Sequence, residues 1–192
     1  MTIEIRQAYL SDTVPLKRLF EAIHDCEEAG KLTTGWKRNA YPLLRHIVAG
    51  IKRGELFALL RDGHVAGAGI INQEQHPAYK DGNWIRQSPD SQVMVLHMLA
   101  IDPQMAGQGL GAEMLRFYAQ YALEHGCPDL RLDTNAINTR ARRFYGRLGF
   151  REAGIVKTEF NGVGEINLVL LESPAAELLR RLAPQAPGPA RG

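Results

Sequence analysis

Residues 93–101 limit the possible folds of this chain more than any other segment. They read Val-Met-Val-Leu-His-Met-Leu-Ala-Ile, and only His97 interrupts the apolar run. Such a run predicts a central strand that is buried on both faces of a sheet. Asp102-Pro103 ends it, and a turn with glycines at positions 107, 109 and 111 then leads into a helical pattern. A buried strand, a glycine-rich turn and a helix therefore follow one another in the middle of the chain.

Hydrophobic periodicity predicts further elements on both sides of that segment. Strands are predicted at residues 3–5, 56–60, 64–72, 93–101, 130–134, 150–156 and 165–171. Helices are predicted at residues 11–23, 43–51, 111–125, 139–148 and 173–182. We expect Ser11 to cap the first helix, and Ser173 and Pro174 to begin the last one. This order predicts a mixed α/β fold in one domain.

Length and composition are those of an ordinary globular domain. The 192 residues are 45% hydrophobic and 23% charged, with a formal net charge of +2. That charge gives no reason to expect nucleic acid or an anionic membrane as a partner. No signal-peptide pattern is visible at the N-terminus, and no apolar run reaches the roughly 20 residues of a membrane helix. We therefore expect a cytoplasmic protein.

A long polar stretch separates the predicted strands at residues 64–72 and 93–101. It covers residues 75–92 and contains Pro77, Asp81-Gly82, Pro89 and Asp90, which are typical of loops. Loops of this length are uncommon in compact domains and often have a function. A functional loop and a mobile surface insertion are both compatible with the sequence.

The glycine-rich turn predicts an anion site made of main-chain amides. A helix start leaves N–H groups without intrahelical partners and carries a partial positive charge. Glycines allow a phosphate to come close to such a backbone, so a diphosphate is the natural ligand. The turn contains no Gly-Lys-Ser/Thr, and its spacing is not that of the dinucleotide fingerprint.

A second motif follows the predicted strand at residues 130–134. It reads Asn138-x-x-Ala141-x-x-Phe144-Tyr145-x-x-x-Gly149-Phe150. Together with Gly107-x-Gly109-x-Gly111 after Asp-Pro, it resembles the GNAT superfamily of N-acetyltransferases. The resemblance is close over residues 93–157, and the order of elements agrees over residues 3–171.

The resemblance implies a fold of the α/β class, α+β in type, with a GNAT-like domain at residues 1–172. Its central sheet is expected to be mixed and mostly antiparallel, with a splayed central strand pair and helices on both faces. Residues 173–183 are then expected to form a C-terminal helix, and residues 184–192, rich in Pro, Ala and Gly, a disordered tail.

The resemblance also implies acetyl-CoA as the cosubstrate. In this family the pantetheine arm pairs with the splayed strand, and the diphosphate binds the amides of the glycine turn. The implied contacts are Leu99, Ala100, Ile101, Gly107, Gln108, Gly109, Leu110, Gly111, Ala112, Asn138 and Tyr145. Ala106 departs from the usual Arg or Gln of the family, so the main-chain amides are expected to matter more. Arg140, Arg142 and Arg143 are candidates for contact with the adenosine 3′-phosphate, with a solvated helix face as the alternative.

Tyr145 is the candidate general acid. Direct transfer to an amine releases a thiolate, which a nearby tyrosine hydroxyl can protonate, and the family uses a tyrosine at this place. A packed aromatic side chain is the alternative. His97 is the candidate general base because imidazole titrates near neutral pH, although a lone histidine in a strand is more often a hydrogen-bonded core residue. Asp133 and Glu159 are further candidates, and the Leu99 amide could bind the developing oxyanion.

These features predict an N-acetyltransferase that moves the acetyl group of acetyl-CoA directly to an amine in a ternary complex. Cys26 and Cys127 lie outside both motifs and form no metal-binding pattern, so neither an acyl-cysteine step nor a metal site is expected. A catalytically silent acyl-CoA sensor or scaffold and a transferase for longer acyl groups are the alternatives. A homodimer is a further expectation that the sequence leaves open.

The acceptor cannot be read from the sequence. In this family it is shaped by the first two helices, by the loop before the central strand and by the last strands. The aromatic candidates there are Trp36, Tyr41 and Trp84. An acidic rim that attracts a cationic amine is one interpretation of Glu27, Glu28, Asp81 and Asp90, and solvated loop charges are the other.

Overall fold

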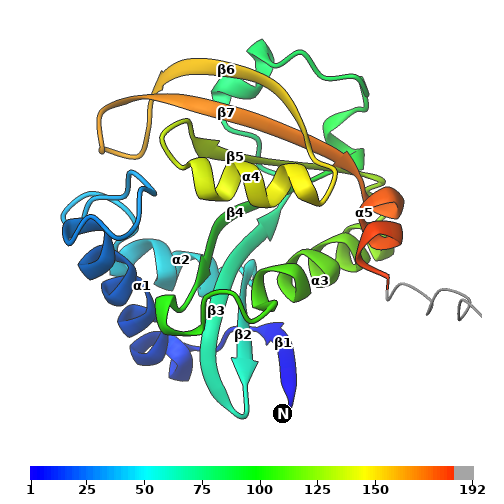
Figure 1. Ribbon diagram of the computed structural model, residues 1–192. Helices are drawn as coiled ribbons and strands as arrows, with labels where there is room; N and C mark the ends of the chain where they lie inside the picture. Colours follow the sequence, from blue (N-terminus) through cyan, green and yellow to red (C-terminus); the bar gives the residue numbers. More distant parts are fainter. Residues whose placement is uncertain (184–192) are drawn as a thin grey trace, which may run out of the picture.

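A seven-stranded sheet forms the centre of the computed structural model, which describes residues 1–183 (Figure 1). The strands are β1 (Ile3–Gln7), β2 (Leu56–Arg61), β3 (His64–Asn72), β4 (Val93–Ile101), β5 (Asp129–Asn135), β6 (Arg151–Glu159) and β7 (Glu165–Pro174). They lie in the order β1-β2-β3-β4-β5-β7-β6, and every neighbouring pair is antiparallel except β4 and β5, which are parallel. The predicted mixed, mostly antiparallel sheet is confirmed.

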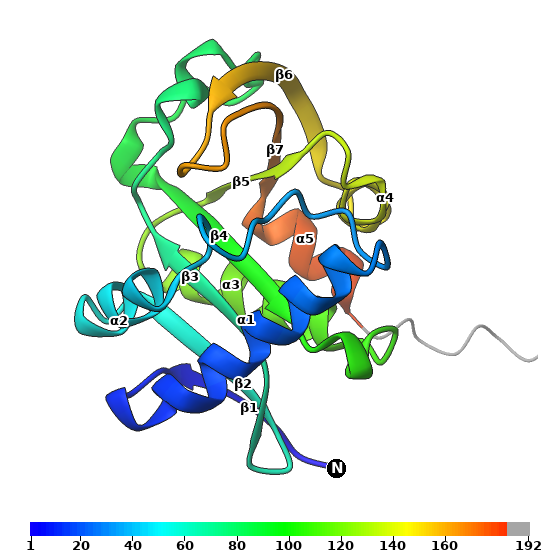
Figure 2. The same cartoon turned by 90° about the vertical axis from the view of Figure 1, so that its left-hand side faces the viewer.

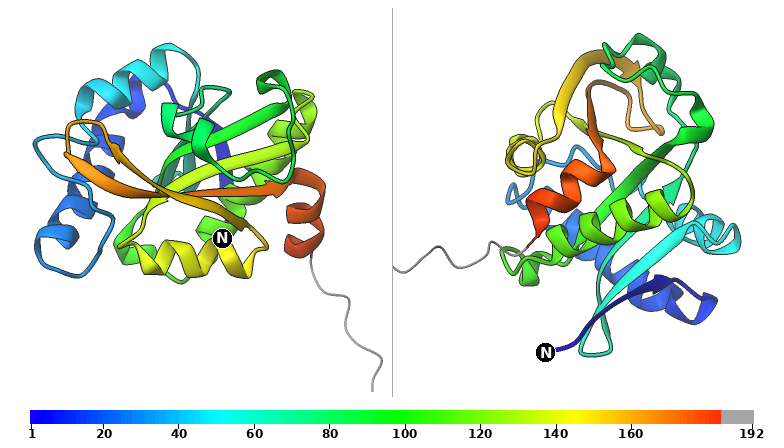
Figure 3. Two further views of the ribbon diagram at one scale, coloured as in Figure 1. Left: turned by 90° about the horizontal axis from the view of Figure 1, so that it is seen from above. Right: turned by 90° about the vertical axis from the view of Figure 1, so that its right-hand side faces the viewer.

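Helices cover both faces of this sheet, as the resemblance predicted. They are α1 (Thr13–Glu28), α2 (Leu44–Lys52), α3 (Leu110–Glu124), α4 (Thr139–Arg147) and α5 (Ala175–Leu182). Figure 2 shows α1 lying across the strands on one face, and Figure 3 shows α3 and α5 side by side on the other. Each face of the sheet packs against its helices to form a hydrophobic core, and successive side chains of β2 point into opposite cores. Ala58 packs with α1 and α2 on one face, while Phe57 packs with α3 on the other.

The central strands β4 and β5 separate halfway along their length. Their ladder joins residues 93–96 to residues 129–132 and then stops. Within the paired half, the buried Tyr118 hydroxyl lies 2.6 Å from the Met94 carbonyl oxygen and 2.9 Å from that of Arg131. Beyond it, Met98 adopts a φ of 57°, and Met98 and Leu99 of β4 lie opposite the single residue Gly69 of β3. This bulge bends β4 away from β5, so the predicted splayed pair is confirmed.

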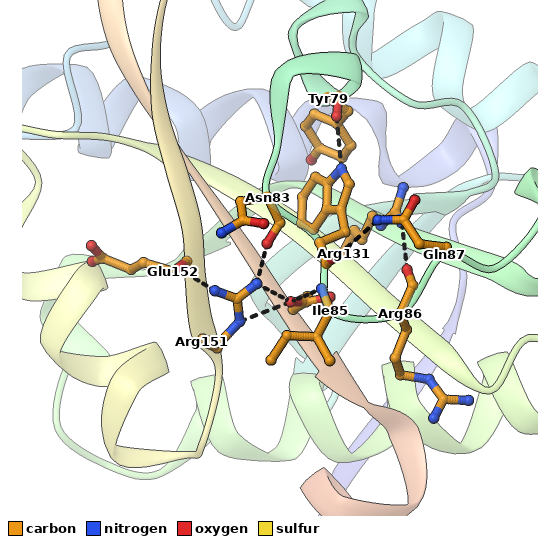
Figure 4. A network of polar contacts seen from close by, with 10 residues as sticks. Tyr79, Asn83, Ile85, Arg86, Gln87, Arg131, Arg151 and Glu152 are labelled. Carbon is orange, nitrogen blue, oxygen red and sulfur yellow. Dashed lines mark hydrogen bonds and ion pairs between the residues drawn. The ribbon is translucent and has the colours of Figure 1, made fainter.

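The polar stretch at residues 75–92 is a packed insertion in the structure. It contains two short 3₁₀ helices, Pro77–Asp81 and Asp90–Gln92, and both Tyr79 in the first helix and Trp84 between the helices are buried. The Trp84 indole N–H donates to the Tyr79 carbonyl at 2.7 Å, and the Arg131 guanidinium lies 4.1 Å from the Trp84 ring centroid (Figure 4). Glu172 of β7 accepts a hydrogen bond from the Ile85 N–H at 2.9 Å. These contacts fasten the insertion to β5 and β7 and argue against a mobile surface loop.

Two predicted helix starts are wrong. Helix α1 begins at Thr13, because Ser11 lies in a 3₁₀ turn and Asp12 bonds the Tyr9 N–H at 2.7 Å and the Arg6 guanidinium. Helix α5 begins at Ala175, because residues 173 and 174 continue β7 alongside β5. The tail predicted at residues 184–192 lies outside the described residues. Within residues 1–183, no helix is both long enough and apolar enough to cross a membrane.

Candidate active site

A cavity of about 420 Å³ opens beside the splayed half of β4. The second half of β4, the glycine turn, the start of α3 and one face of α4 form most of its wall. Apart from the arginine candidates on α4, every position predicted to contact acetyl-CoA lines this cavity except Gln108, whose side chain accepts a hydrogen bond from Arg61. The fold therefore brings the two sequence motifs together around one opening.

The glycine turn presents main-chain amides at this cavity. Gly107 and Gly109 have φ values of 81° and 82°, in the left-handed region that glycine adopts without a side-chain clash. Gly109 caps α3, so the N–H groups of Leu110 and Gly111 lie in the first helical turn, where no intrahelical acceptor exists. A side-chain carbon at Gly111 would lie 3.1 Å from Phe144, so glycine also allows α3 to approach α4. This arrangement suits a phosphate group.

The separation of β4 from β5 leaves main-chain groups along the cavity without a strand partner. The β4–β5 ladder ends at the Leu96–Leu132 pair, whereas Ala100 and Ile101 still pair with β3. The β5-facing side of residues 99–101 is therefore open to an extended ligand that carries amide groups. Together with the glycine turn, these residues fit the pantetheine arm and the diphosphate of coenzyme A.

Two arginines of α4 bring positive charge to the cavity. Arg140 and Arg147 line it and are exposed, and a spacing of seven residues places them on the same face of the helix. Arg142 instead pairs with Glu152 at 2.8 and 2.9 Å, and Arg143 is exposed outside the cavity wall. One of the three predicted arginines thus reaches the cavity, and Arg147 joins it.

Asn138 and Tyr145 stand where this cavity meets a second one. The Asn138 side chain caps α4 by accepting the Ala141 N–H at 3.1 Å, and it lines both cavities. Tyr145 is 7% exposed, and its ring centroid lies 5.8 Å from that of Phe150. Burial, with a smaller effect of the nearby Asp133 carboxylate, raises the pKa of the Tyr145 hydroxyl well above its usual value. That hydroxyl therefore stays protonated at neutral pH and remains a proton donor.

The second cavity is smaller, at about 100 Å³, and shares part of its wall with the first. The residues that line both are Thr34, Trp36, Leu99, Asn138, Ala141 and Tyr145. Of the aromatic residues predicted to shape the acceptor site, Trp36 and Tyr41 line this cavity, while Trp84 lies inside the insertion. Asp133 adds a carboxyl group and Phe160 adds a third aromatic ring to the wall of this cavity.

The predicted acidic rim does not line either cavity. Glu27 accepts hydrogen bonds from the main-chain N–H groups of Thr34 and Gly35 at 2.7 and 2.8 Å, so it shapes the segment that leads to Trp36. Glu28 forms an ion pair with Arg38. Asp81 and Asp90 belong to the insertion, where Asp90 accepts a hydrogen bond from the Gln75 side chain at 2.6 Å.

Comparison with known proteins identifies the family. The sequence model of the Acetyltransferase (GNAT) family matches residues 16–150, which is more than half of the chain. The chain belongs to the GNAT family of acetyltransferases. An uncharacterized N-acetyltransferase of Methanocaldococcus jannaschii is 34% identical over 77 residues, which cover 40% of this chain and 34% of that protein. This GNAT chain spans less than half the length of the first three curated relatives that it matches.

A longer match extends over most of the GNAT domain. A Bacillus subtilis protein, provisionally named a ribosomal protein bS18 alanine N-acetyltransferase, is 25% identical over 143 residues, or 74% of this chain and 82% of that protein. The crystal structure of a GNAT acetyltransferase from Streptococcus agalactiae superposes with a TM-score of 0.70 and 22% identity, covering 90% of this chain and 95% of that one. At that identity the superposition supports the GNAT fold.

The base candidates of this GNAT chain differ in their access to the cavities. His97 lines neither, and its Nε2 lies 3.0 Å from the Glu74 carbonyl oxygen and 3.1 Å from Asn72 Oδ1. Burial lowers the pKa of His97, with the Asp133 carboxylate acting in the opposite direction. Asp133 lines the second cavity, and burial raises the pKa of its carboxyl. Glu159 is exposed and lines neither, so geometry favours Asp133.

The sequence analysis missed two side chains of the site. The i, i+7 spacing from Arg140 was a usable signal for Arg147, since both lie within the second motif. Phe160 had no such signal. It follows β6 in the connection to β7, far in sequence from Trp36 and Tyr41, and only the folded chain brings it to their cavity.

Proposed function

We propose that this protein transfers the acetyl group of acetyl-CoA directly to an amine bound beside it. The observation that supports this most is the pair of adjoining cavities with Tyr145 in their common wall. The larger one offers main-chain pairing and an anion-binding turn to coenzyme A, and the smaller one leaves room for an acceptor. Two substrates held side by side meet the geometric requirement of direct transfer in a ternary complex.

Each chemical step of the transfer has a candidate protein group near the wall that the two cavities share. Acetyl-CoA supplies the activated thioester. Asp133 is placed in the smaller cavity to take the proton that the attacking amine loses. The main-chain amide of Leu99, next to the bulge at Met98, is available to the developing oxyanion. Tyr145 can then protonate the departing thiolate of coenzyme A, because its hydroxyl stays protonated at neutral pH.

A covalent acyl-enzyme route lacks a suitably placed thiol. Cys26 lies on α1, and Cys127 is buried next to the start of β5. Neither cysteine lines the two cavities. Burial also raises the pKa of Cys127, which lowers the fraction of nucleophilic thiolate at neutral pH.

The test is thiol release from acetyl-CoA in the presence of a panel of primary amines. We expect release that depends on both substrates and gives intersecting lines in initial-rate plots. Parallel lines, or acetyl transfer to the protein without an acceptor, would contradict direct transfer. Binding of coenzyme A without turnover on any amine would favour an acyl-CoA sensor instead.

A further inference from the structure

Three aromatic rings form a corner of the smaller cavity, here called the aromatic corner and made of Trp36, Tyr41 and Phe160. The centroid of the Tyr41 ring lies 6.0 Å from that of Trp36 and 5.6 Å from that of Phe160, at interplanar angles of 86° and 85°. The Lys37 ammonium donates to the Val163 carbonyl at 2.7 Å and so joins the segment before α2 to the β6–β7 connection. The corner is therefore assembled from two chain segments that a direct hydrogen bond holds together.

The Asp133 carboxylate lines the same cavity from β5. Its Oδ2 accepts a hydrogen bond from the Tyr79 hydroxyl at 2.8 Å. Among the described residues, that is its only side-chain hydrogen bond, and His97, whose own pKa is lowered by burial, is the one basic group whose charge would favour the ionised carboxylate. An ionised carboxylate has room for several donors. It is costly to bury without a compensating charge, so this side chain is suited to a cationic ligand.

We propose that the acceptor enters this cavity as a compact, unbranched primary ammonium group, held between Asp133 and the aromatic corner. This inference rests on the proposed function, because it assigns the smaller cavity to the acceptor. An ammonium group donates hydrogen bonds to a carboxylate and is attracted to the faces of aromatic rings. Asp133 takes one proton from the bound ammonium group and passes it to solvent, which leaves a neutral amine as the nucleophile. Asp133 is then free again to take the second proton, which the nitrogen loses after it attacks the thioester.

The size of the cavity limits the acceptor further. About 100 Å³ is smaller than the engineered apolar cavity of about 150 Å³ that holds benzene, so only a slender group can enter. An ammonium group on a few methylenes meets this limit. The α-amine of a peptide is bulkier, because its carbon carries a side chain and a peptide carbonyl. Free alkylamines and lysine side chains share the inferred chemistry, and experiment can separate these two sources.

Binding can be measured without turnover by saturating the protein with coenzyme A and titrating small probes in a calorimeter. We expect n-butylamine to bind at least tenfold more tightly than n-butanol, its neutral counterpart of equal size. Asp133→Asn should bring the two affinities to within about threefold of each other, and Phe160→Leu should weaken n-butylamine alone. Glu124→Gln, at the exposed end of α3, is the matched control and should leave the ratio unchanged.

Equal affinities of the two probes in the unmodified protein would overturn the inference. So would a preference for n-butylamine that persists in Asp133→Asn. Affinity for coenzyme A is recorded for each variant, because its retention shows that the variant is folded.

Turnover then separates the sources of the ammonium group and keeps this inference distinct from the proposed function. The substrates are n-butylamine, an N-terminally blocked peptide with one lysine, and an unblocked peptide without lysine. The higher kcat/KM of the first two identifies the source, and preferential use of the third overturns the inference. If n-butylamine binds through Asp133 but no substrate releases thiol, the proposed function fails and the cation site stands. If transfer occurs but binding is independent of Asp133, only the present inference fails.

Discussion

Replacing Tyr145 by Phe tests the chemistry at the junction of the two cavities. The substitution removes one oxygen atom and keeps the ring, which packs beside Phe144 and Phe150. Within residues 1–183 the hydroxyl makes no hydrogen bond to another protein group, so its loss leaves no buried partner unsatisfied. We therefore expect the free energy of unfolding to change by less than about 1 kcal/mol.

The expected loss of activity is much larger. A positioned general acid contributes about 10²- to 10⁴-fold to a rate. A tyrosine hydroxyl is protonated at neutral pH, and burial raises the pKa of Tyr145 further, so the unmodified protein carries the proton and the variant, which has no hydroxyl, loses the donor completely. We expect kcat to fall about 100- to 1,000-fold, which corresponds to about 2.7–4 kcal/mol in the activation free energy. KM for acetyl-CoA should stay close to that of the unmodified enzyme.

Tyr118→Phe is the matched control. The Tyr118 hydroxyl is also buried, but it contacts the Met94 and Arg131 carbonyl oxygens of β4 and β5 at 2.6 and 2.9 Å. Its removal should cost about 1–2 kcal/mol of stability. For a chain of this length, that lowers Tm by about 2–8 °C. The effect on kcat should stay within a few-fold, because Tyr118 lines neither cavity.

The assay follows thiol release at saturating acetyl-CoA and amine, with Tm measured on the same samples. An unchanged kcat in Tyr145→Phe would remove the tyrosine from the mechanism. Equal losses of kcat in both variants would show that packing, rather than proton donation, connects these tyrosines to activity.

Three further predictions concern the glycine turn, the Asp133 carboxyl and the positive charge at the larger cavity. Gly109→Ala and Gly126→Ala both place a side chain at a φ above 70°, so each should lose about 1–2 kcal/mol of stability, but only Gly109→Ala should raise KM for acetyl-CoA. Equal KM values in the two variants would contradict the anion site. Because folding raises the pKa of Asp133, the folded state binds this proton more tightly than the unfolded chain, and stability falls as pH rises from 3.8 through the raised pKa. Denaturant unfolding at both pH values measures how Asp133→Asn changes the free energy of unfolding. That change should be more favourable to the variant at pH 7 than at pH 4. The same change at both pH values would refute the upward shift assigned to the Asp133 pKa. Arg147→Ala should raise KM for acetyl-CoA about fivefold, the equivalent of about 1 kcal/mol, and more at low salt, whereas Arg143→Ala should not. Equal KM changes in these two variants would leave Arg147 without a role at the cavity.

Local sequence patterns were sufficient to predict the elements that carry the motifs. The apolar run at residues 93–101 is β4, with the predicted bounds, because a strand buried on both faces leaves little room for polar side chains. Gly109 caps α3, which begins at Leu110, one residue before the predicted start, and Asn138 caps α4. The predictions failed where tertiary pairing competes with local signals. Ser173 and Pro174 belong to β7 rather than to the last helix because they pair with β5. No sequence pattern within ten residues indicates that pairing.

Sequence patterns could not predict the second cavity either, because contacts between distant segments form it. Tyr79 and Asp133 form a hydrogen bond across 54 positions, and the aromatic corner joins residue 41 to residue 160. Asp133 resembles any polar residue near the end of a strand until folding places Tyr79 against it. Burial by distant segments, rather than its own neighbours in sequence, raises the pKa of its carboxyl.

The sequence by itself determined the order of the elements, the central strand and the glycine turn that suits a phosphate group. These features depend on side-chain periodicity and on backbone freedom within a few residues, which are local properties of a chain. Only the tertiary structure decided where β4 leaves β5, which arginines of α4 reach the larger cavity and which side chains surround the smaller one. Those features depend on contacts between segments that are distant in sequence, and such contacts form only when the whole sheet assembles and its two cores are filled.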